Sequence, residues 1–200
     1  MHDTQHLSFD VHLDNGRILH FEQDDPVAVA SALQRLQPTR VFAEEQLVVA
    51  GDTHTTTLPT RAILYIHMRF DKMPEWAFRS DHEVEQISAE DFADVAARRV
   101  QREQAPSGNF IAHAEMNLVN GSSIYLRATG QAPPIALRAR ASIRLLEQSS
   151  LMLRSAEGGL LAIRPASISS LAIYPGAPEV PSSAVLAHLV AKPNVGQGES

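Results

Sequence analysis

Histidine and carboxylate side chains gather on the predicted polar face of one N-terminal hairpin. The chain has 200 residues, among them nine histidines and no cysteine. Alternation of apolar and polar residues places four side chains on the same side of two paired strands: Asp10, His12, His20 and Glu22. Imidazole and carboxylate ligands could hold zinc or another divalent ion there. A solvent-exposed polar face explains the same pattern more simply, so we predict no metal site and no cofactor.

Motifs of the common catalytic classes are missing from the sequence. The absence of cysteine excludes a thiol nucleophile, a disulfide scaffold and a cysteine-ligated metal. The sequence has no Gly-x-Ser-x-Gly elbow, no His-Glu-x-x-His pair and no glycine-rich phosphate loop. It therefore leaves open whether the protein is an enzyme, and it favours a non-catalytic binding or assembly module with an unknown partner.

The alternative is an enzyme, or a protein that binds a small ligand or a metal, with a pocket where two units of the chain meet. Four residues are the candidates to line such a pocket: His20, His67, Tyr125 and Arg138. His67 also lies within an apolar pattern, where a hydrogen-bonded structural histidine is the competing interpretation. No catalytic residue is assigned.

Two Asn-Gly turns between alternating apolar runs predict β-hairpins that resemble each other. In the first, a three-residue loop ending at Gly16 pairs Val11 with Leu19 and gathers the apolar side chains on one face. In the second, a loop ending at Gly121 pairs Met116 with Ile124. Each glycine is expected in the left-handed conformation.

The segments after the two hairpins also match each other. A buried strand, a turn, a strand that ends at a proline and a last strand are predicted over residues 47–68 and again over 151–174. We interpret the chain as an α+β, β-rich protein made of two similar antiparallel units that arose by internal duplication and pack their apolar faces together. The units span residues 1–70 and 109–176.

Helices are expected between and after these units. Residues 25–36 carry a capping Asp25 and an apolar stripe, and Pro38 stops the helix. The matching segment of the second unit, residues 134–146, alternates as a strand does, so strand and helix both stay open there. The polar connector, residues 71–108, has a helix start at Ser88 after a polar loop, and the C-terminal part, residues 177–200, has a short helix and a tail.

The charge and the hydropathy of the chain restrict the classes of partner it can bind and its expected location in the cell. The net charge of −6 argues against nucleic-acid binding, since the only local basic cluster is Arg138, Arg140 and Arg144, which is typical of a solvated face. No apolar run approaches the ~20 residues of a membrane-spanning helix. The N-terminal residues do not resemble a secretory signal, so the cytoplasm is the expected location. Predicted sheet edges and the amphipathic C-terminal segment suggest a homodimer.

Overall fold

The structure is a computed structural model that describes residues 6–51, 53–74, 76–77, 82–96, 109–131, 145–174 and 185. The described residues of the first half form two hairpins, two helices, a 3₁₀ turn and a closing strand. In chain order these are β1 (Leu7–Leu13), β2 (Ile18–Gln23), α1 (Pro26–Arg35), α2 (Pro38–Val41), β3 (Gln46–Ala50), β4 (Thr55–Pro59), η1 (Thr60–Ala62) and β5 (Ile63–Phe70).

The second half begins with a strand and a helix from the connector and then has a similar order. Its described elements are β6 (His82–Ile87), α3 (Ala89–Ala96), β7 (Asn109–Leu118), β8 (Ser123–Gln131), β9 (Leu151–Arg154), β10 (Leu160–Ile163), η2 (Pro165–Ser167) and β11 (Ile168–Tyr174). The molecule is thus β-rich with a few helices, as the α+β prediction requires.

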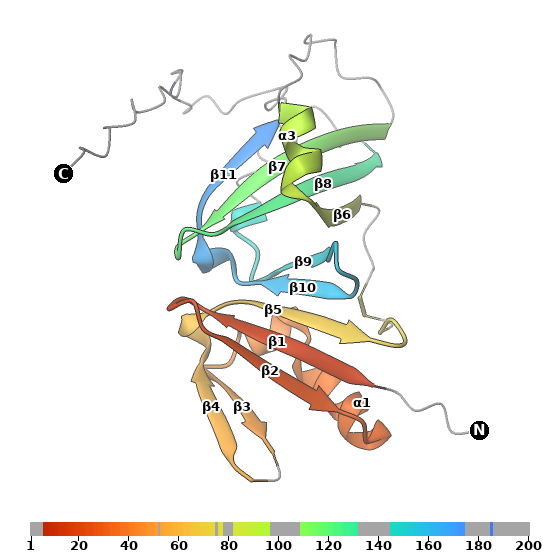
Figure 1. Ribbon diagram of the computed structural model, residues 1–200, viewed down its shortest axis with the longest axis vertical. Helices are drawn as coiled ribbons and strands as arrows, with labels where there is room; N and C mark the ends of the chain where they lie inside the picture. The colour runs from red at the N-terminus through yellow and green to blue at the C-terminus, as the bar shows by residue number, and fades with distance from the viewer. Residues whose placement is uncertain are drawn as a thin grey trace, which may run out of the picture.

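One nine-stranded sheet runs through both halves in the order β11-β7-β8-β6-β9-β10-β5-β1-β2. Figure 1 shows it extending from β11 at the top to β2 near the bottom, with α1 beside the lower part and α3 beside the upper part. The hairpin β3–β4 forms a sheet of its own and points away from the body. All strand pairs in these sheets are antiparallel except β6 with β9.

The predicted hairpin registers are confirmed. Val11 lies opposite Leu19 in the first hairpin, and Met116 lies opposite Ile124 in the second. Gly16 and Gly121 have φ angles of 82° and 86°, the left-handed conformation that a residue with a Cβ avoids. In both turns an asparagine side chain accepts a hydrogen bond from the backbone two residues later.

The first helix is also confirmed. The carboxylate of Asp25 accepts a hydrogen bond from the N–H of Ala28 at 2.8 Å and so caps α1. Val29 and Leu33 are buried in the same core as the apolar side chains of the first hairpin. Pro38 does more than stop this helix, because it is the first residue of the short helix α2.

The described residues form two hydrophobic cores, which lie on opposite sides of strand β10. Leu160 and Ala162 belong to the core under α1, and Leu161 and Ile163 belong to the core of the second half. All four residues of β10 are buried. A strand covered on both faces needs apolar side chains at every position, and β10 has them.

The two halves join through strand edges, not through packed faces as predicted. Leu160 lies opposite Met68 and Ile163 opposite Tyr65, so β10 continues the sheet directly from β5. Backbone pairing satisfies the N–H and C=O groups that an edge would leave open, which side-chain packing of two faces would not do. The polar loop expected before Ser88 is also wrong over the described residues 82–87, because these residues form β6, which pairs with β8.

The described elements repeat several backbone contacts 105 positions apart. The N–H of Asp14 donates to the carbonyl oxygen of Ala62, and the N–H of Val119 donates to that of Ser167. Leu64 is the extra residue in the pairing of β5 with β1, and Ser169 is the extra residue in the pairing of β11 with β7. The strand triples β5-β1-β2 and β11-β7-β8 therefore share order, register and irregularity.

Some predicted segments lie outside the described residues. These are most of 134–146 and nearly all of 177–200, and the candidate residue Arg138 is among them. None of the helices in the described part of the chain has the length and apolar stretch needed to cross a bilayer.

Candidate functional site

A chain of polar contacts crosses three strands of the first half on the face opposite α1. The carboxylate of Asp10 on β1 lies 2.5 Å from Nδ1 of His20 on β2 and accepts a hydrogen bond of 2.6 Å from Nη2 of Arg69 on β5. Glu22 lies 2.9 Å from Nε2 of the same His20. These positions share one face because Asp10 lies opposite His20 in β2 and opposite His67 in β5.

His67 continues this chain into the turn between β9 and β10. Its Nε2 lies 2.8 Å from the carbonyl oxygen of Gly158, and its Nδ1 lies 2.8 Å from Nη1 of Arg69. Because the guanidinium is only a donor and the carbonyl only an acceptor, Nδ1 must be unprotonated and Nε2 must carry the proton. A buried neutral imidazole with both nitrogens bonded holds the two halves together and has no free nitrogen for catalysis.

Asp10, His20, Glu22, His67 and Arg69 form the Asp10 cluster, whose hydrogen bonds shift the pKa values of Asp10 and His20. Burial alone would raise the pKa of the Asp10 carboxyl, but hydrogen bonds from His20 and Arg69 outweigh it, and the pKa lies below its ordinary value. The hydrogen bonds to Asp10 and then Glu22 raise the pKa of His20. His20 is half exposed, so water screens these interactions.

His12 sits at the other end of the same face in a different environment. Its ring stacks on Tyr65 with centroids 4.0 Å apart and an interplanar angle of 19°. Burial lowers the pKa of His12, and it raises the pKa of Tyr65. The pair therefore favours two neutral rings at neutral pH. His12 does not join His20 around a common point, which a shared metal ion would require.

The described residues contain no group of three or more histidine, aspartate or glutamate side chains arranged to hold a metal ion. The nearest approach is at His20, where both ring nitrogens face carboxylates.

The corresponding face of the second half is covered. Tyr125, at the position that matches His20, stacks on Phe92 of α3 with centroids 4.7 Å apart. The ring of Tyr174 on β11 lies perpendicular to the same Phe92 ring, with centroids 5.1 Å apart. Helix α3 begins as predicted, since Ser88 Oγ accepts a hydrogen bond from the N–H of Asp91. Tyr125 thus fills a packing site and faces no pocket with His20.

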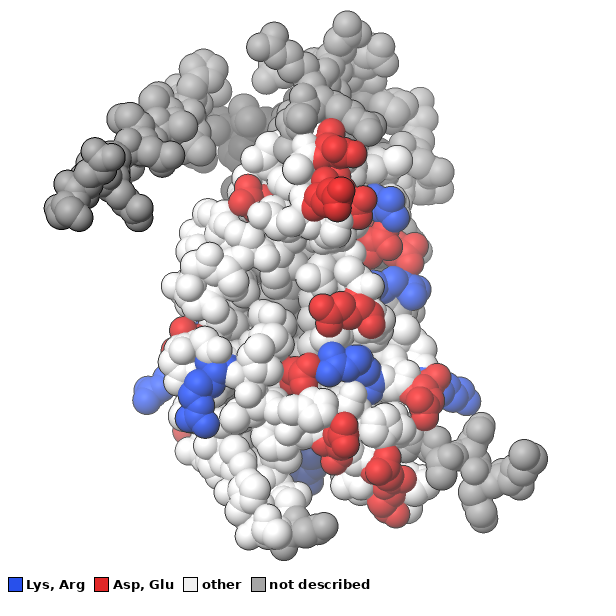
Figure 2. All heavy atoms as spheres, in the orientation of Figure 1, with Lys and Arg blue, Asp and Glu red and all other residues white. Residues whose placement is uncertain are grey.

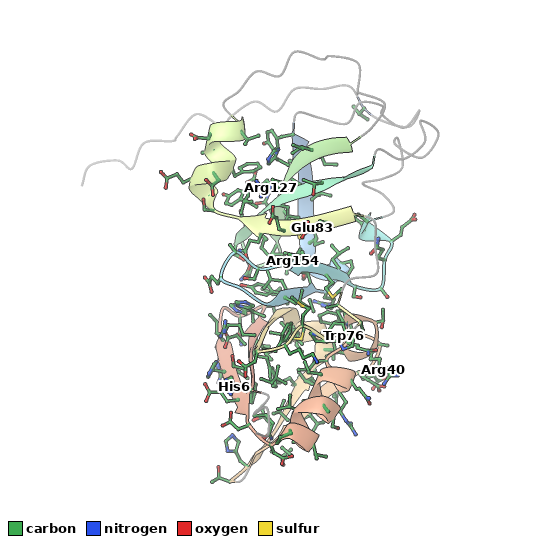
Figure 3. The ribbon with its side chains drawn as sticks, turned by 90° about the vertical axis from the view of Figure 1, so that its right-hand side faces the viewer. His6, Arg40, Trp76, Glu83, Arg127 and Arg154 are labelled. Carbon is green, nitrogen blue, oxygen red and sulfur yellow. The ribbon has the colours of Figure 1, made fainter. Side chains whose placement is uncertain are left out.

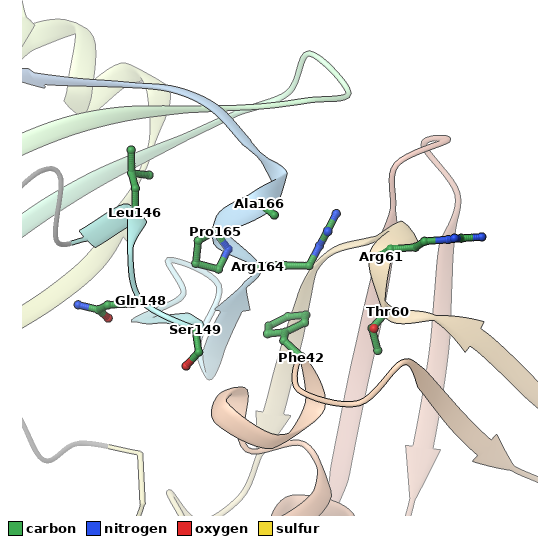
Figure 4. Close-up of a pocket in the computed structure, with 9 residues that line it drawn as sticks. All are labelled: Phe42, Thr60, Arg61, Leu146, Gln148, Ser149, Arg164, Pro165 and Ala166. Atoms are coloured by element: carbon green, nitrogen blue, oxygen red, sulfur yellow. The ribbon is translucent and has the colours of Figure 1, made fainter.

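A shallow depression of about 480 Å³ lies at the junction of the two halves. Its lining comes from both halves and includes Thr60 and Arg61 of the first and Arg164 and Pro165 of the second. Figure 4 shows the side chains of Arg61 and Arg164 leaving the depression in different directions. Nε of Arg164 donates to the carbonyl oxygen of Ile63 at 2.8 Å, so this arginine also ties the halves together.

The predicted pocket residues are therefore brought together only in part. Asp10 and Arg69 link His20 to His67, Tyr125 packs elsewhere, and Arg138 lies outside the described residues. The sequence reasoning missed Arg69, although the alternation of β5 puts it on the face of His67. It also named, as pocket candidates, none of the residues that line the depression at the junction of the halves, because these residues lie far apart in the sequence.

Charged side chains of both signs alternate along one side of the molecule (Figure 2). Figure 3 shows part of this series, with Arg127, Glu83 and Arg154 one below another on β8, β6 and β9. Glu83 pairs with Nε of Arg154 at 2.7 Å, and Glu85 pairs with Arg127.

Comparison of the chain with protein-family models, with curated proteins and with solved structures gives no match.

Proposed function

We propose that this protein is a non-catalytic binding or assembly module that acts through the edges of its sheets. The observation that carries the proposal is the state of those edges in the described part of the chain. The large sheet ends at β11, and β4 has no partner beyond β3. Neither β4 nor β11 contains a charged residue. Natural proteins usually block such edges with charges or cover them, since open edges pair with other chains.

The polar groups of the first half support the same proposal. Asp10, His20, Arg69 and His67 hold one another, and the last of them is buried. A catalytic group has to reach a substrate, and a binding pocket usually encloses most of its ligand. We infer that these four side chains brace the strands β2, β1 and β5 against one another, and that they serve neither as a catalytic site nor as a binding pocket.

Internal duplication and a homo-oligomer, with a dimer as its simplest form, belong to this proposal. The hydrogen bonds of Asp14 and Val119, 105 positions apart, support a duplication of the unit β1–β5 as β7–β11. The extra residues Leu64 and Ser169 add to this support, because an irregularity is harder to repeat by chance than a regular strand. A cytoplasmic location stays a prediction from the sequence.

Sedimentation equilibrium over a wide range of protein concentration tests the proposal. We expect the average mass to rise above that of one chain as the concentration increases. A monomer at every concentration would contradict the self-association. Turnover of a substrate by the pure protein, lost on substitution of His20 or His67, would contradict the non-catalytic role.

A further inference from the structure

We propose that β4 of one copy of this chain pairs with β11 of a second copy, as an antiparallel addition to the large sheet. The proposal rests on the assembly function proposed above and names its partner and its register. Figure 1 shows the two strands at opposite ends of the molecule, so the contact joins copies head to tail. Such a contact uses a different surface on each partner and leads to a ring or an open chain.

The register comes from a pairing that already exists inside the chain. Strand β10 adds to the outer edge of β5, with Leu160 opposite Met68 and Ala162 opposite Ile66. Strand β4 occupies the place of β10 in the first half, and β11 occupies the place of β5 in the second half. The equivalent contact would place Thr55 opposite Ile173 and Thr57 opposite Leu171.

The backbone of β4 presents its free hydrogen-bonding groups in the way this register needs. The N–H of Gly51 bonds to the carbonyl of His54, and that of Thr60 bonds to Glu45. Because hydrogen-bonded pairs alternate along an antiparallel ladder, Thr56 and Leu58 face β3, while Thr55 and Thr57 face outward. Those two outward residues are the ones that would bond to β11.

The same alternation of residues that face the neighbouring strand and residues that face outward holds for the pairing of β10 with β5. This agreement supports the register taken from that pairing. The N–H of Arg164 donates to the carbonyl of Leu64 on β5, and this places Leu160 and Ala162 toward β5 as well. One difference remains: Pro59 stands where Arg164 stands in the second half and has no N–H to donate. The contact between copies would therefore have one hydrogen bond fewer than the contact of β10 with β5, and it would be weaker.

A disulfide between introduced cysteines can trap a weak contact. Because the chain has no cysteine of its own, only the introduced pair can form the cross-link. Thr56 and Ala172 would face each other as a non-hydrogen-bonded pair, whose Cα separation allows a disulfide. We would mix Thr56→Cys protein with Ala172→Cys protein under mild oxidation and measure the mixed dimer. The matched control mixes Val48→Cys with Ala172→Cys, because Val48 is exposed on the other strand of the same hairpin.

Proline substitution tests the backbone contact. Thr57→Pro removes an outward N–H without touching the ladder to β3, and we expect the cross-linking rate to fall about five- to tenfold, as the loss of one hydrogen bond implies. Val48→Pro removes the outward N–H of the opposite strand, since Val48 lies opposite Thr57, and should leave the rate unchanged.

Cross-linking of Thr56→Cys with Ala172→Cys that exceeds the control and falls in Thr57→Pro supports the contact. Self-association in sedimentation without this selective cross-link would overturn the contact and keep the assembly function. A monomer at every concentration, without the selective cross-link, would overturn both the contact and the proposed self-association.

Discussion

The hairpins β3–β4 and β9–β10 hold the same place in the two halves, yet only β9–β10 lies inside the large sheet. Leu47 and Leu151 are buried at the start of each hairpin, and a 3₁₀ turn comes after each. The difference lies in the second strand, where β10 reads Leu-Leu-Ala-Ile and β4 reads Thr-Thr-Thr-Leu-Pro. A strand between two cores must bury both faces, and threonine hydroxyls would lose their hydrogen bonds to water there. The side chains of one strand thus decide which hairpin joins the halves.

The largest loss of stability is expected when an apolar side chain of β10 is shortened. Leu161→Ala should lower the free energy of unfolding by about 2–5 kcal/mol, because it leaves a cavity in a fully packed core. Thr56→Ala, at the matching position of the outer hairpin, should change it by about 0.5 kcal/mol or less. Urea denaturation of both variants measures the difference. Equal losses would mean that β3–β4 is packed as tightly as β9–β10.

The turn of the inner hairpin gives a second test. Gly159 has a φ of +80°, and a Cβ there would lie 2.0 Å from the carbonyl oxygen of Met68 on β5. Gly159→Ala should cost about 2–4 kcal/mol, from left-handed strain and overpacking together. Gly16→Ala and Gly121→Ala, which meet open space, should each cost about 1–2 kcal/mol from strain alone.

Thermal unfolding compares the three glycine variants, with His54→Ala as the control. His54 ends the matching turn of the outer hairpin and is exposed, so its replacement should be nearly neutral. A Gly159→Ala protein as stable as Gly16→Ala would show that β5 can move away from the turn.

The smallest effect concerns the open polar face of the first half, whose counterpart lies under α3. NMR titration should find the pKa of His20 above 6.5, raised by its bonds to Asp10 and Glu22, and that of His12 below 6.5 because it is buried against Tyr65. Asp10 and Glu157 oppose the lowering of the pKa of His12, and the charge of Arg69 adds to it.

The two shifts act on stability with opposite signs. The bonds of His20 stabilise the fold below the unfolded pKa, and this contribution is lost as the pH rises through the folded pKa. Burial of His12 costs stability as the pH falls below 6.5, because only the unfolded chain takes up the proton readily. His20→Asn should remove the acid-side gain, which screening keeps below about 0.5 kcal/mol. An unchanged difference in stability between pH 5 and pH 8 would contradict the role given to His20.

Patterns within one hairpin or one helix could be predicted well, because neighbours in the sequence determine them. Gly16 and Gly121 set the turns, and the apolar faces beside them set the registers. The alternation of apolar and polar residues in the same hairpin predicted the polar face that carries Asp10 and His20. Arg69 lies 59 positions from its partner Asp10, and Gly158 lies 91 positions from its partner His67, so no local period reports these contacts.

By itself the sequence determined the local elements of this protein: two glycine-bulge hairpins, the capped helix α1, the start of α3 and the strands that come after each hairpin. The tertiary structure alone decided that β10 pairs with β5, that β6 becomes a strand and that His67 is fixed between Arg69 and Gly158. The reason is that strand pairing depends on backbone groups that every residue carries. Side-chain burial, which depends on the whole fold, then selects among the edges that could pair.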